Sequence, residues 1–510
     1  MKTAIVQKVM EYSEKTPEKL AIIDNTKTLT YMELKKWILR VGSFLRRNGI
    51  RNGEKVLISA EAKVEYIVVY LAVHSVGGVC VPMDILFTET EIEDFRESVN
   101  SRFIITLKKI ENRKEKIKYW NIEDICKEVD DEEFETFVEL ENSADVLFTS
   151  GTTGLSKGVV VTHLNTIVGA ENIIEGVSMP KDTVDLLGVP LHHAFGLGTI
   201  RALLYNGSTI VLMNGFKSMK ILRQLITKYS CNAISIVPAA LNLLNELSKG
   251  NLYLLLGDLN YIEIGTAAIS FEMKKKLVSE FPKTNIYVAY GSTESPRTVY
   301  MNLQNNEKRW NSIGKPVTQA HAKIVVNSEY SGNPSIKKQG RLVFYGEMNS
   351  PRYYENELET TKVFIDGCYY TNDIGYIDDD GYIYLLGRAN DLINVGGKKV
   401  PSFYIENIIN DFPNIEHCAC IPIDDPILGE VPYVFISLEN KVEKINWKQL
   451  RNELENELPK YMFPRGFQIV DKFPLNRVGK IDKKLLTMQV DYEKNINFCG
   501  SGTANSFKRM

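Results

Sequence analysis

Short apolar runs rich in β-branched residues alternate with amphipathic stretches of helical length up to about residue 386. Seven runs carry this pattern most clearly: VLIS, GVCVPMD, VDLLGVP, STIVLM, CNAISIVP, YIEIG and NIYVAYG. Strands that alternate with helices are typical of α/β layers with largely parallel sheets. The pattern therefore predicts a large N-terminal domain of layered α/β sheets.

The pattern changes near residue 323. From there to residue 384, short strand-like runs are joined by turns with Asp-Gly and Gly, which predicts a small antiparallel, β-barrel-like subdomain. After residue 387, helix-like segments at 401–412 and 446–458 accompany the strand-like HCACIPI and PYVFISLE, which predicts a smaller α+β domain. We expect domains over residues 1–389 and 390–490, and a flexible polar tail over 491–510.

Length and composition agree with a soluble protein of at least two folded units. The chain has 510 residues, of which 44% are hydrophobic and 25% charged. Its net charge of -3 gives no general attraction to nucleic acid or to an anionic membrane. The most apolar window, residues 64–82, contains Glu65 and His74, which favours a buried helix leading into a strand over a membrane span.

The N-terminal segment and the cysteines indicate a cytoplasmic location. Charged residues interrupt the first apolar positions every few residues, unlike a signal peptide. The seven cysteines lack a CxxC pair or the spacing of metal ligands, so we interpret them as reduced, inert thiols. Cys418 and Cys420 alternate on one face of an expected strand, and burial explains their proximity better than zinc does.

The strongest chemical signal is the segment LFTSGTTGLSKG over residues 147–158. Its glycines let backbone N–H groups approach an anion, while its hydroxyls and its lysine add donors and positive charge. It is not a Walker A loop, because Lys157 follows Gly154 by three positions and precedes Gly158. The alternative is a surface turn. The candidate nucleotide-binding residues here are Thr149, Ser150, Gly151, Thr152, Thr153, Gly154 and Lys157.

This segment resembles the adenylate-forming (AMP-binding) superfamily, in its branch of acyl-CoA and aryl-CoA synthetases. Six further family-like segments follow in the expected order: PLHHAFG (190–196), YGSTE (290–294), YYTND (369–373), GRAND (387–391), NVGGKKVP (394–401) and PLNRVGK (474–480). The resemblance covers about residues 15–487. It implies a mobile C-terminal lid and an enzyme that uses ATP and Mg²⁺.

The resemblance implies roles for three segments that bind the nucleotide. Tyr290 would pack on adenine, Thr293 would contact the α-phosphate, and Glu294 would bind magnesium, with Thr152 as a second candidate metal ligand. A plain turn is the alternative for this pentapeptide. The remaining candidates of these segments are Gly291, Ser292, Gly265, Thr266 and Ala267.

Asp373 would hold the ribose hydroxyls, assisted by Arg388. Asn372 stands where the family usually has glycine, and asparagine tolerates left-handed backbone geometry better than most residues. A turn-capping aspartate is the alternative for Asp373.

The family-like PLNRVGK segment makes Lys480 the candidate catalytic lysine of the adenylation step, in which a carboxylate that attacks an anionic α-phosphate needs positive charge. A solvated surface lysine is the alternative. The resemblance places the thiol-transfer loop at Gly396 and Gly397, and the hinge of the small domain at Asn390. Lysine or aspartate is commoner at that hinge.

His192 and His193 are candidates for the acyl and thiol site, with His193 as a gating or carboxylate-positioning group. Packing residues are the alternative. The segment PLHHAFGLG lacks the aspartate with which amino-acid-activating relatives pair the substrate ammonium, so we expect an acid without an α-amine.

The resemblance implies a two-step ligase. ATP would convert a carboxylic acid into an acyl-adenylate with release of pyrophosphate, and the acyl group would pass to the thiol of CoA. The alternative acceptor is the phosphopantetheine arm of a carrier protein. A protein that binds nucleotide without catalysis would be expected to lack Lys480, Glu294 or Asp373, and all three are present. Aliphatic and aromatic acids both stay open.

Overall fold

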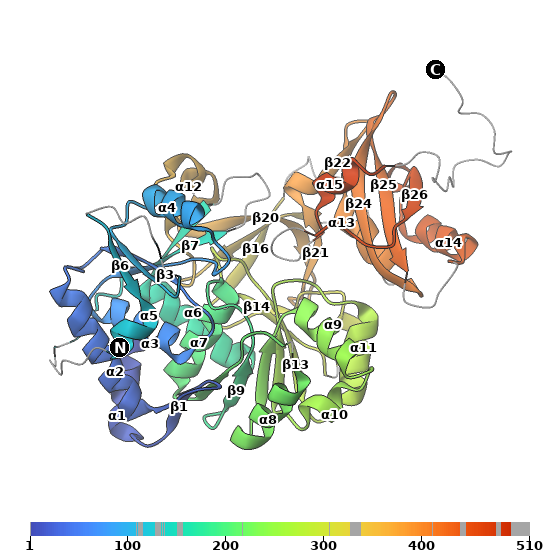
Figure 1. Ribbon diagram of the computed structural model, residues 1–510. Coiled ribbons are helices and arrows are strands. Elements are labelled where there is room, and N and C mark those ends of the chain that lie inside the picture. Colours follow the sequence, from blue (N-terminus) through green and yellow to red (C-terminus); the bar gives the residue numbers. More distant parts are fainter. Residues whose placement is uncertain are drawn as a thin grey trace. The chain divides into compact units, whose positions relative to one another are not determined.

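The computed structural model describes residues 2–108, 110, 116–127, 134, 136, 138–149, 157–216, 218–304, 306–326, 338–410, 412–438, 445–475 and 481–490. The chain divides into two compact units (Figure 1). The first comprises Met1–Ala268, Lys276–Ala322 and Phe344–Tyr370, and the second comprises Ile269–Lys275, Lys323–Val343 and Thr371–Met510.

A nine-stranded sheet of the first unit has the order β15-β14-β13-β12-β11-β9-β10-β1-β2. Its strands are β1 (Leu20–Ile23), β2 (Thr28–Thr30), β9 (Val184–Leu187), β10 (Thr209–Leu212), β11 (Ala233–Ile236), β12 (Tyr261–Ile264), β13 (Asn285–Tyr290), β14 (Val299–Asn302) and β15 (Lys315–Pro316). The six consecutive strands from β13 to β1 are parallel. This confirms five of the seven apolar runs as strands of a largely parallel sheet.

The other two runs belong to a seven-stranded sheet of the same unit, with the order β18-β8-β7-β4-β3-β5-β6. Its strands are β3 (Lys55–Ser59), β4 (Val79–Pro82), β5 (Phe103–Thr106), β6 (Lys118–Asn121), β7 (Ser143–Thr149), β8 (Lys157–Thr162) and β18 (Arg352–Tyr353). Strands β7 and β8 are antiparallel, so the chain leaves β7 and returns along β8 around the predicted phosphate-binding segment.

Eleven α-helices of the described chain lie wholly in the first unit: α1 (Ile5–Lys15), α2 (Tyr31–Arg47), α3 (Val64–Ser75), α4 (Glu89–Ser98), α5 (Ile122–Lys127), α6 (His163–Gly176), α7 (Ala194–Asn206), α8 (Met219–Tyr229), α9 (Pro238–Leu247), α10 (Leu252–Leu256) and α12 (Glu357–Val363). Helix α11 (Phe271–Glu280) contributes residues to both units. Thr162 begins α6 through a capping box with Asn165, which satisfies backbone donors of the first turn.

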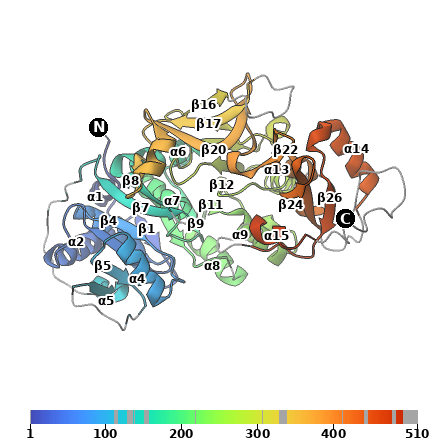
Figure 2. The ribbon, with the colours of Figure 1, turned by 90° about the horizontal axis from the view of Figure 1, so that it is seen from above.

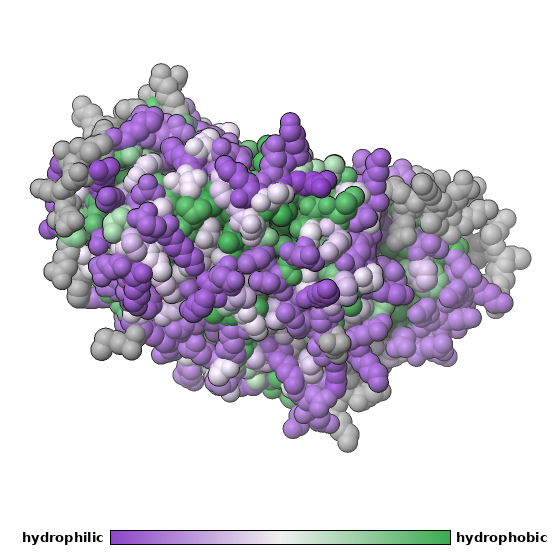
Figure 3. Space-filling view, turned by 90° about the horizontal axis from the view of Figure 1, so that it is seen from below, coloured by the Kyte–Doolittle hydropathy of each residue, from purple (hydrophilic) through white to green (hydrophobic). Residues whose placement is uncertain are grey.

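Helix α3 explains the most apolar window of the sequence. All of its residues are buried, and the chain leads from it into β4, as predicted. In the part of the chain that the structure describes, no helix has the length and apolarity needed to cross a bilayer. The face of the molecule in Figure 3 is mainly hydrophilic, with smaller hydrophobic areas between the polar residues.

A five-stranded sheet is formed by β16 (His321–Val326), β17 (Gly340–Tyr345), β19 (Phe364–Ile365), β20 (Cys368–Ile377) and β21 (Ile383–Arg388). Strand β20 pairs antiparallel with β19 in its first residues and with β21 from Asp373 on. These pairs confirm the prediction of short antiparallel strands joined by turns.

The second unit contains a sheet of the order β23-β22-β25-β24, with β26 paired to β25. Its elements are β22 (Leu392–Val395), β23 (Lys398–Pro401), α13 (Ser402–Asn410), β24 (Ile415–Asp425), β25 (Gly429–Leu438), α14 (Trp447–Glu457), β26 (Gly466–Ile469) and α15 (Lys483–Thr487). Figure 2 shows α13 and α14 beside this sheet. Cys418 and Cys420 are buried in its core, which confirms burial as the reason for their spacing.

Candidate active site

Parallel strands bring three predicted segments to one edge of the nine-stranded sheet. The loop with His192 and His193 follows β9, the strip from Gly265 to Ala267 follows β12, and YGSTE ends β13. Because β9, β11, β12 and β13 run parallel, their carboxyl ends meet at the same edge. Ligands of open α/β sheets bind at this edge.

The YGSTE segment folds back tightly, and Gly291 is what allows this. A Cβ atom on Gly291 would lie 2.4 Å from the backbone nitrogen of Arg297, so no other residue fits without a shift of the backbone. The ring of Tyr290 is half-buried, with its centroid 5.9 Å from that of Phe344. Ser292 is exposed and Thr293 is half-buried at the turn. Gly291 is therefore required for the backbone conformation of this loop.

Glu294 lies at the centre of a buried contact that joins two of the predicted motifs. Its carboxylate accepts a hydrogen bond of 2.8 Å from the hydroxyl of Tyr353. The ammonium of Lys157 lies 5.2 Å from the centroid of the same tyrosine ring. Burial and the neighbouring Glu294 raise the pKa of Tyr353 well above its usual value, so the phenol stays protonated and donates. Tyr353 lies outside every motif of the sequence described above.

Lys157 also forms an ion pair with Glu359 of α12, with 2.5 Å between Nζ and Oε2. Hydrogen bonds from Lys157 and Lys362 lower the pKa of Glu359 to about 2. An anionic oxygen therefore already contacts the lysine that the sequence assigns to phosphate. A phosphate oxygen can take the place of this carboxylate, since both accept charge-assisted hydrogen bonds from an ammonium group.

The strip after β12 combines a glycine packed against an aromatic ring with a residue in the left-handed backbone region. Gly265 is buried against the ring of Phe195, and a Cβ atom there would lie 2.2 Å from that ring. Thr266 has a φ of 78°, in the left-handed region that β-branched residues rarely adopt. Its side chain and that of Ala267 are exposed. Glycine adopts this φ without strain, so the threonine at this position carries backbone strain.

A buried polar network under this edge was missed by the sequence analysis. Arg297 donates to Glu263 over 2.9 Å, and its guanidinium lies 3.7 Å from the centroid of the Phe195 ring. Glu263 also accepts a hydrogen bond from Tyr300. The acidic residue in the apolar run YIEIG was the available signal, since a buried carboxylate needs a partner.

The hydroxyl of Ser235 continues this network to a second carboxyl group. It lies 3.1 Å from Glu263 Oε2 and 3.1 Å from Asp185 Oδ2. One hydroxyl proton can serve only one of these contacts, so the other needs a proton from a carboxyl group. Burial, and then the charge of Glu263, raise the pKa of Asp185 to about 7.

His192 is half-buried, whereas His193 is exposed and precedes α7. Their ring centroids are 4.1 Å apart. Burial and the neighbouring His193 lower the pKa of His192 to about 4, so its imidazole is neutral at pH 7. The carboxylate of Asp84 lies 3.9 Å from His192 Nε2. Asp84 is distant from PLHHAFG in the sequence, so no local motif predicts this contact.

In the second unit, Asp373 and Arg388 face each other across β20 and β21. They are register partners, and Arg388 Nε lies 3.2 Å from Asp373 Oδ1. Asp373 and Asn372 therefore lie within a strand, which excludes the turn-capping alternative and removes the need for left-handed geometry at Asn372.

Gly396 and Gly397 are the two central residues of the tight turn between β22 and β23. Their φ angles of 56° and 86° are those of a two-residue hairpin turn that favours glycine. Asn390 lies in the short 3₁₀ turn Ala389–Asp391 before β22.

Several predicted residues lie outside what the structure describes. These are Ser150, Gly151, Thr152, Thr153, Gly154, Lys480 and the tail over 491–510. Thr149 is described only through its backbone in β7, and Asn390 only through its backbone in the 3₁₀ turn. Their predicted roles stay predictions.

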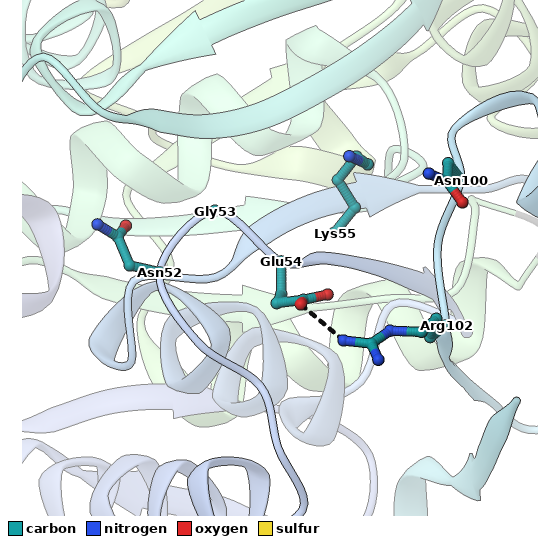
Figure 4. Close-up of a pocket in the computed structure, with 6 residues that line it drawn as sticks. All are labelled: Asn52, Gly53, Glu54, Lys55, Asn100 and Arg102. Atoms are coloured by element: carbon teal, nitrogen blue, oxygen red, sulfur yellow. Dashed lines mark hydrogen bonds and ion pairs between the residues drawn. The ribbon is translucent and has the colours of Figure 1, made fainter. Parts of the chain in front are cut away.

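Two other polar features of the first unit lie outside this set of residues. His74, Cys80 and Asp145 converge in the core, but Arg201 Nη2 lies 2.5 Å from Asp145 Oδ2 and supplies the compensating charge. A pocket of about 390 Å³ is lined by Asn52, Gly53, Glu54, Lys55, Asn100 and Arg102 (Figure 4). Figure 4 shows Glu54 paired with Arg102 in it, at the amino end of β3.

Comparison with known proteins gives matches over most of the chain. A family model described as AMP-binding enzyme matches residues 9–354, and one described as AMP-binding enzyme C-terminal domain matches residues 404–480. The 2-succinylbenzoate–CoA ligase of Staphylococcus epidermidis is 26% identical over 485 residues, 93% of this chain and 96% of the relative. The 4-coumarate–CoA ligase 3 of Arabidopsis thaliana is 26% identical over 486 residues, 90% of this chain and 86% of the relative.

The solved structure of o-succinylbenzoate CoA synthetase from Bacillus subtilis, in complex with its acyl-adenylate intermediate, is similar in fold. Its TM-score is 0.82 at 23% identity, over 97% of this chain and 100% of that one. The complex of the same synthetase with ATP and magnesium also has a TM-score of 0.82 at 23% identity, over 96% of this chain and 100% of that one. This likeness confirms the predicted fold class, with a large α/β region and a smaller C-terminal part.

Proposed function

The chain belongs to the AMP-binding enzyme family, and from this we propose that it converts a carboxylic acid with ATP into an acyl-adenylate and then into a CoA thioester. The observation that carries the proposal is the contact of Lys157 and Glu294 with the same buried tyrosine. A cationic group and a carboxylate from distant motifs thus lie together at the site. This combination suits a metal-bound triphosphate.

Each of these residues of the first unit would have a separate role in the adenylation step. The half-buried ring of Tyr290 offers a face for adenine, and Thr293 offers a hydroxyl for the α-phosphate. Lys157 provides positive charge where the attacking carboxylate and the phosphates repel each other. Glu294 supplies a hard oxygen ligand that fits Mg²⁺, and the bound metal would neutralise the charge of the leaving pyrophosphate. Thr152 is the second proposed metal ligand.

The residues of the second unit would act on the ribose and in the second step. Asp373 and Arg388 offer an acceptor and donors for the ribose hydroxyls. We propose that residues 390–490 move as a lid about Asn390. This movement would present Lys480 to the site in the first step and the hairpin at Gly396 and Gly397 in the second. His193, exposed at the start of α7, would gate the acyl and thiol site, and His192 would contact the acid.

The names of the relatives support CoA as the acceptor. Two of them are named as CoA ligases of aromatic acids, and these names include both a carboxylic acid as the substrate and CoA as the acceptor. A carrier protein is the alternative acceptor. A cytoplasmic location stays a prediction, and the six cysteines of the described chain are free thiols, as a reducing compartment allows.

The proposal is tested by pyrophosphate release with a panel of aliphatic and aromatic acids, each with CoA or with a holo carrier protein. We expect release that requires an acid, ATP and Mg²⁺, with thioester formed on CoA. Glu294→Gln should lower the rate roughly 10²-fold, the scale of losing one charge-stabilising group. No release with any acid would contradict the proposal, and thioester only on the carrier would replace CoA as the acceptor.

A further inference from the structure

Tyr353 joins the two motifs of the first unit without belonging to either. It ends β18, where its backbone pairs with Val159 of β8, two residues after Lys157. Its backbone N–H donates to the hydroxyl of Thr360 in α12 over 3.0 Å. Only 5% of its surface is exposed. Three elements therefore fix where its hydroxyl and its ring lie.

The segment that carries Tyr353 also holds the backbone of Glu294. The N–H of Ser350 donates to the carbonyl oxygen of Glu294 over 2.8 Å. The side chain of Glu294 then accepts the hydrogen bond from the Tyr353 hydroxyl. Two contacts, one to the backbone and one to the carboxylate, thus determine the direction of this carboxyl group. Metal-binding carboxylates are commonly oriented by such a hydrogen bond.

The ring of Tyr353 contacts Lys157, whereas its hydroxyl contacts Glu294. The Lys157 ammonium lies over its face, and Phe364 packs edge-on against it with centroids 5.3 Å apart. A cation over an aromatic face is attracted by the ring and not by the hydroxyl. The hydroxyl and the ring of one residue therefore have separable functions.

We propose that Tyr353 is a positioning residue of the adenylation site, whose hydroxyl orients Glu294 toward Mg²⁺ and whose ring supports Lys157 beside the phosphates. This inference rests on the proposed function, because it presumes that Glu294 and Lys157 bind the metal and the nucleotide. Tyr353 would act through these two side chains.

Two substitutions separate the two functions. Tyr353→Phe removes the hydroxyl and keeps the ring, whereas Tyr353→Leu removes both. Tyr354→Phe is the matched control, because the Tyr354 hydroxyl lies 3.1 Å from the carbonyl oxygen of Val99 and 2.8 Å from Glu355 Oε1, and its one proton goes to one of these acceptors and not to Glu294. Thermal unfolding of each variant establishes that it is folded.

Calorimetric titration with α,β-methylene-ATP, with Mg²⁺ and with EDTA, measures nucleotide binding without turnover. Tyr353→Phe should bind the magnesium complex roughly 10-fold to 100-fold more weakly, the usual cost of losing such an orienting group. Its affinity for the metal-free analogue should stay within about twofold of the wild type, since its ring still supports Lys157. Tyr353→Leu should lose affinity under both conditions, and Tyr354→Phe under neither.

Equal affinity of Tyr353→Phe and wild type for the magnesium complex would overturn the inference. Equal weakening with and without metal would do so as well, because it would indicate a structural role only. If the wild-type protein bound no nucleotide and released no pyrophosphate, the proposed function itself would fail. An active wild type with an unaffected Tyr353→Phe would leave the proposed function intact.

Discussion

Asp185 lies fully buried in β9 and shares its hydrogen bonds with Ser235 and Tyr261. Its pKa rises from an ordinary 3.8 to about 7 in the folded protein. The unfolded chain therefore releases this proton near pH 4, whereas the folded chain holds it to about pH 7. Ionisation of the unfolded state then lowers stability as the pH rises between these two values.

Asp185→Asn should remove this part of the pH dependence. Between pH 5 and pH 7 the free energy of unfolding of the wild type should fall more steeply than that of the variant, by up to about 1.4 kcal/mol per pH unit. Urea unfolding at pH 5, 6 and 7 measures both slopes. The control is Asp182→Asn, at an exposed position before β9, which should keep the wild-type slope. If the free energy of unfolding had the same pH dependence in the wild type and in Asp185→Asn, the raised pKa of Asp185 in the folded protein would be refuted.

Thr266 holds a backbone conformation that costs a β-branched residue free energy. Replacement by glycine removes the strain of the 78° φ angle but gives the unfolded chain more freedom. Because the first effect is the larger, we expect Thr266→Gly to raise the free energy of unfolding by about 1 kcal/mol. Urea unfolding measures it, and Ala267→Gly is expected to destabilise instead. A destabilised Thr266→Gly would show that the threonine side chain makes a stabilising contact.

At the scale of the elements, substitutions in the hairpin of β22 and β23 can show whether its two glycines are needed for the turn geometry alone or also for thiol transfer. Gly397 has a φ of 86°, and a Cβ atom there would meet no atom within 4 Å. Gly397→Ala should therefore lower stability by about 1 kcal/mol through backbone strain alone, and Gly397→Asn by less. If the hairpin takes the thiol, both should slow thioester formation while pyrophosphate exchange in the adenylation step stays near the wild-type rate. Equal loss of both steps would contradict the role in thiol transfer.

The hydrophobic pattern of the sequence predicts individual strands but not which distant side chains they bring together. Buried parallel strands have apolar residues on both faces, so runs such as VDLLGVP and YIEIG identified β9 and β12. The same runs contain Asp185 and Glu263, yet their partners come from other segments of the chain. Tyr353 lies beside Lys157 because β18 pairs with β8, and strand pairing over such sequence separation cannot be read from local periodicity.

At the scale of the whole molecule, the two half-reactions make opposite demands on one site. Adenylation needs cations around the phosphates, whereas the thiol must reach the acyl carbon after pyrophosphate has left. The first unit contains Lys157 and Glu294, while Lys480 falls in the residue range of the second. A lysine supplied by a different unit can serve one step and be absent from the other.

Lys480→Ala should therefore separate the two steps. We expect acid-dependent pyrophosphate release to fall roughly 10²-fold to 10³-fold, as for loss of one group that stabilises developing charge. Thioester formation from a supplied acyl-adenylate should stay within about twofold of the wild type, because the phosphate repulsion has then been overcome. Lys484→Ala, at an exposed position of α15, is the control and should change neither rate. Comparable loss of both rates in Lys480→Ala would mean that the lysine stabilises one closed arrangement used throughout, and the alternation of the lid would have to be abandoned.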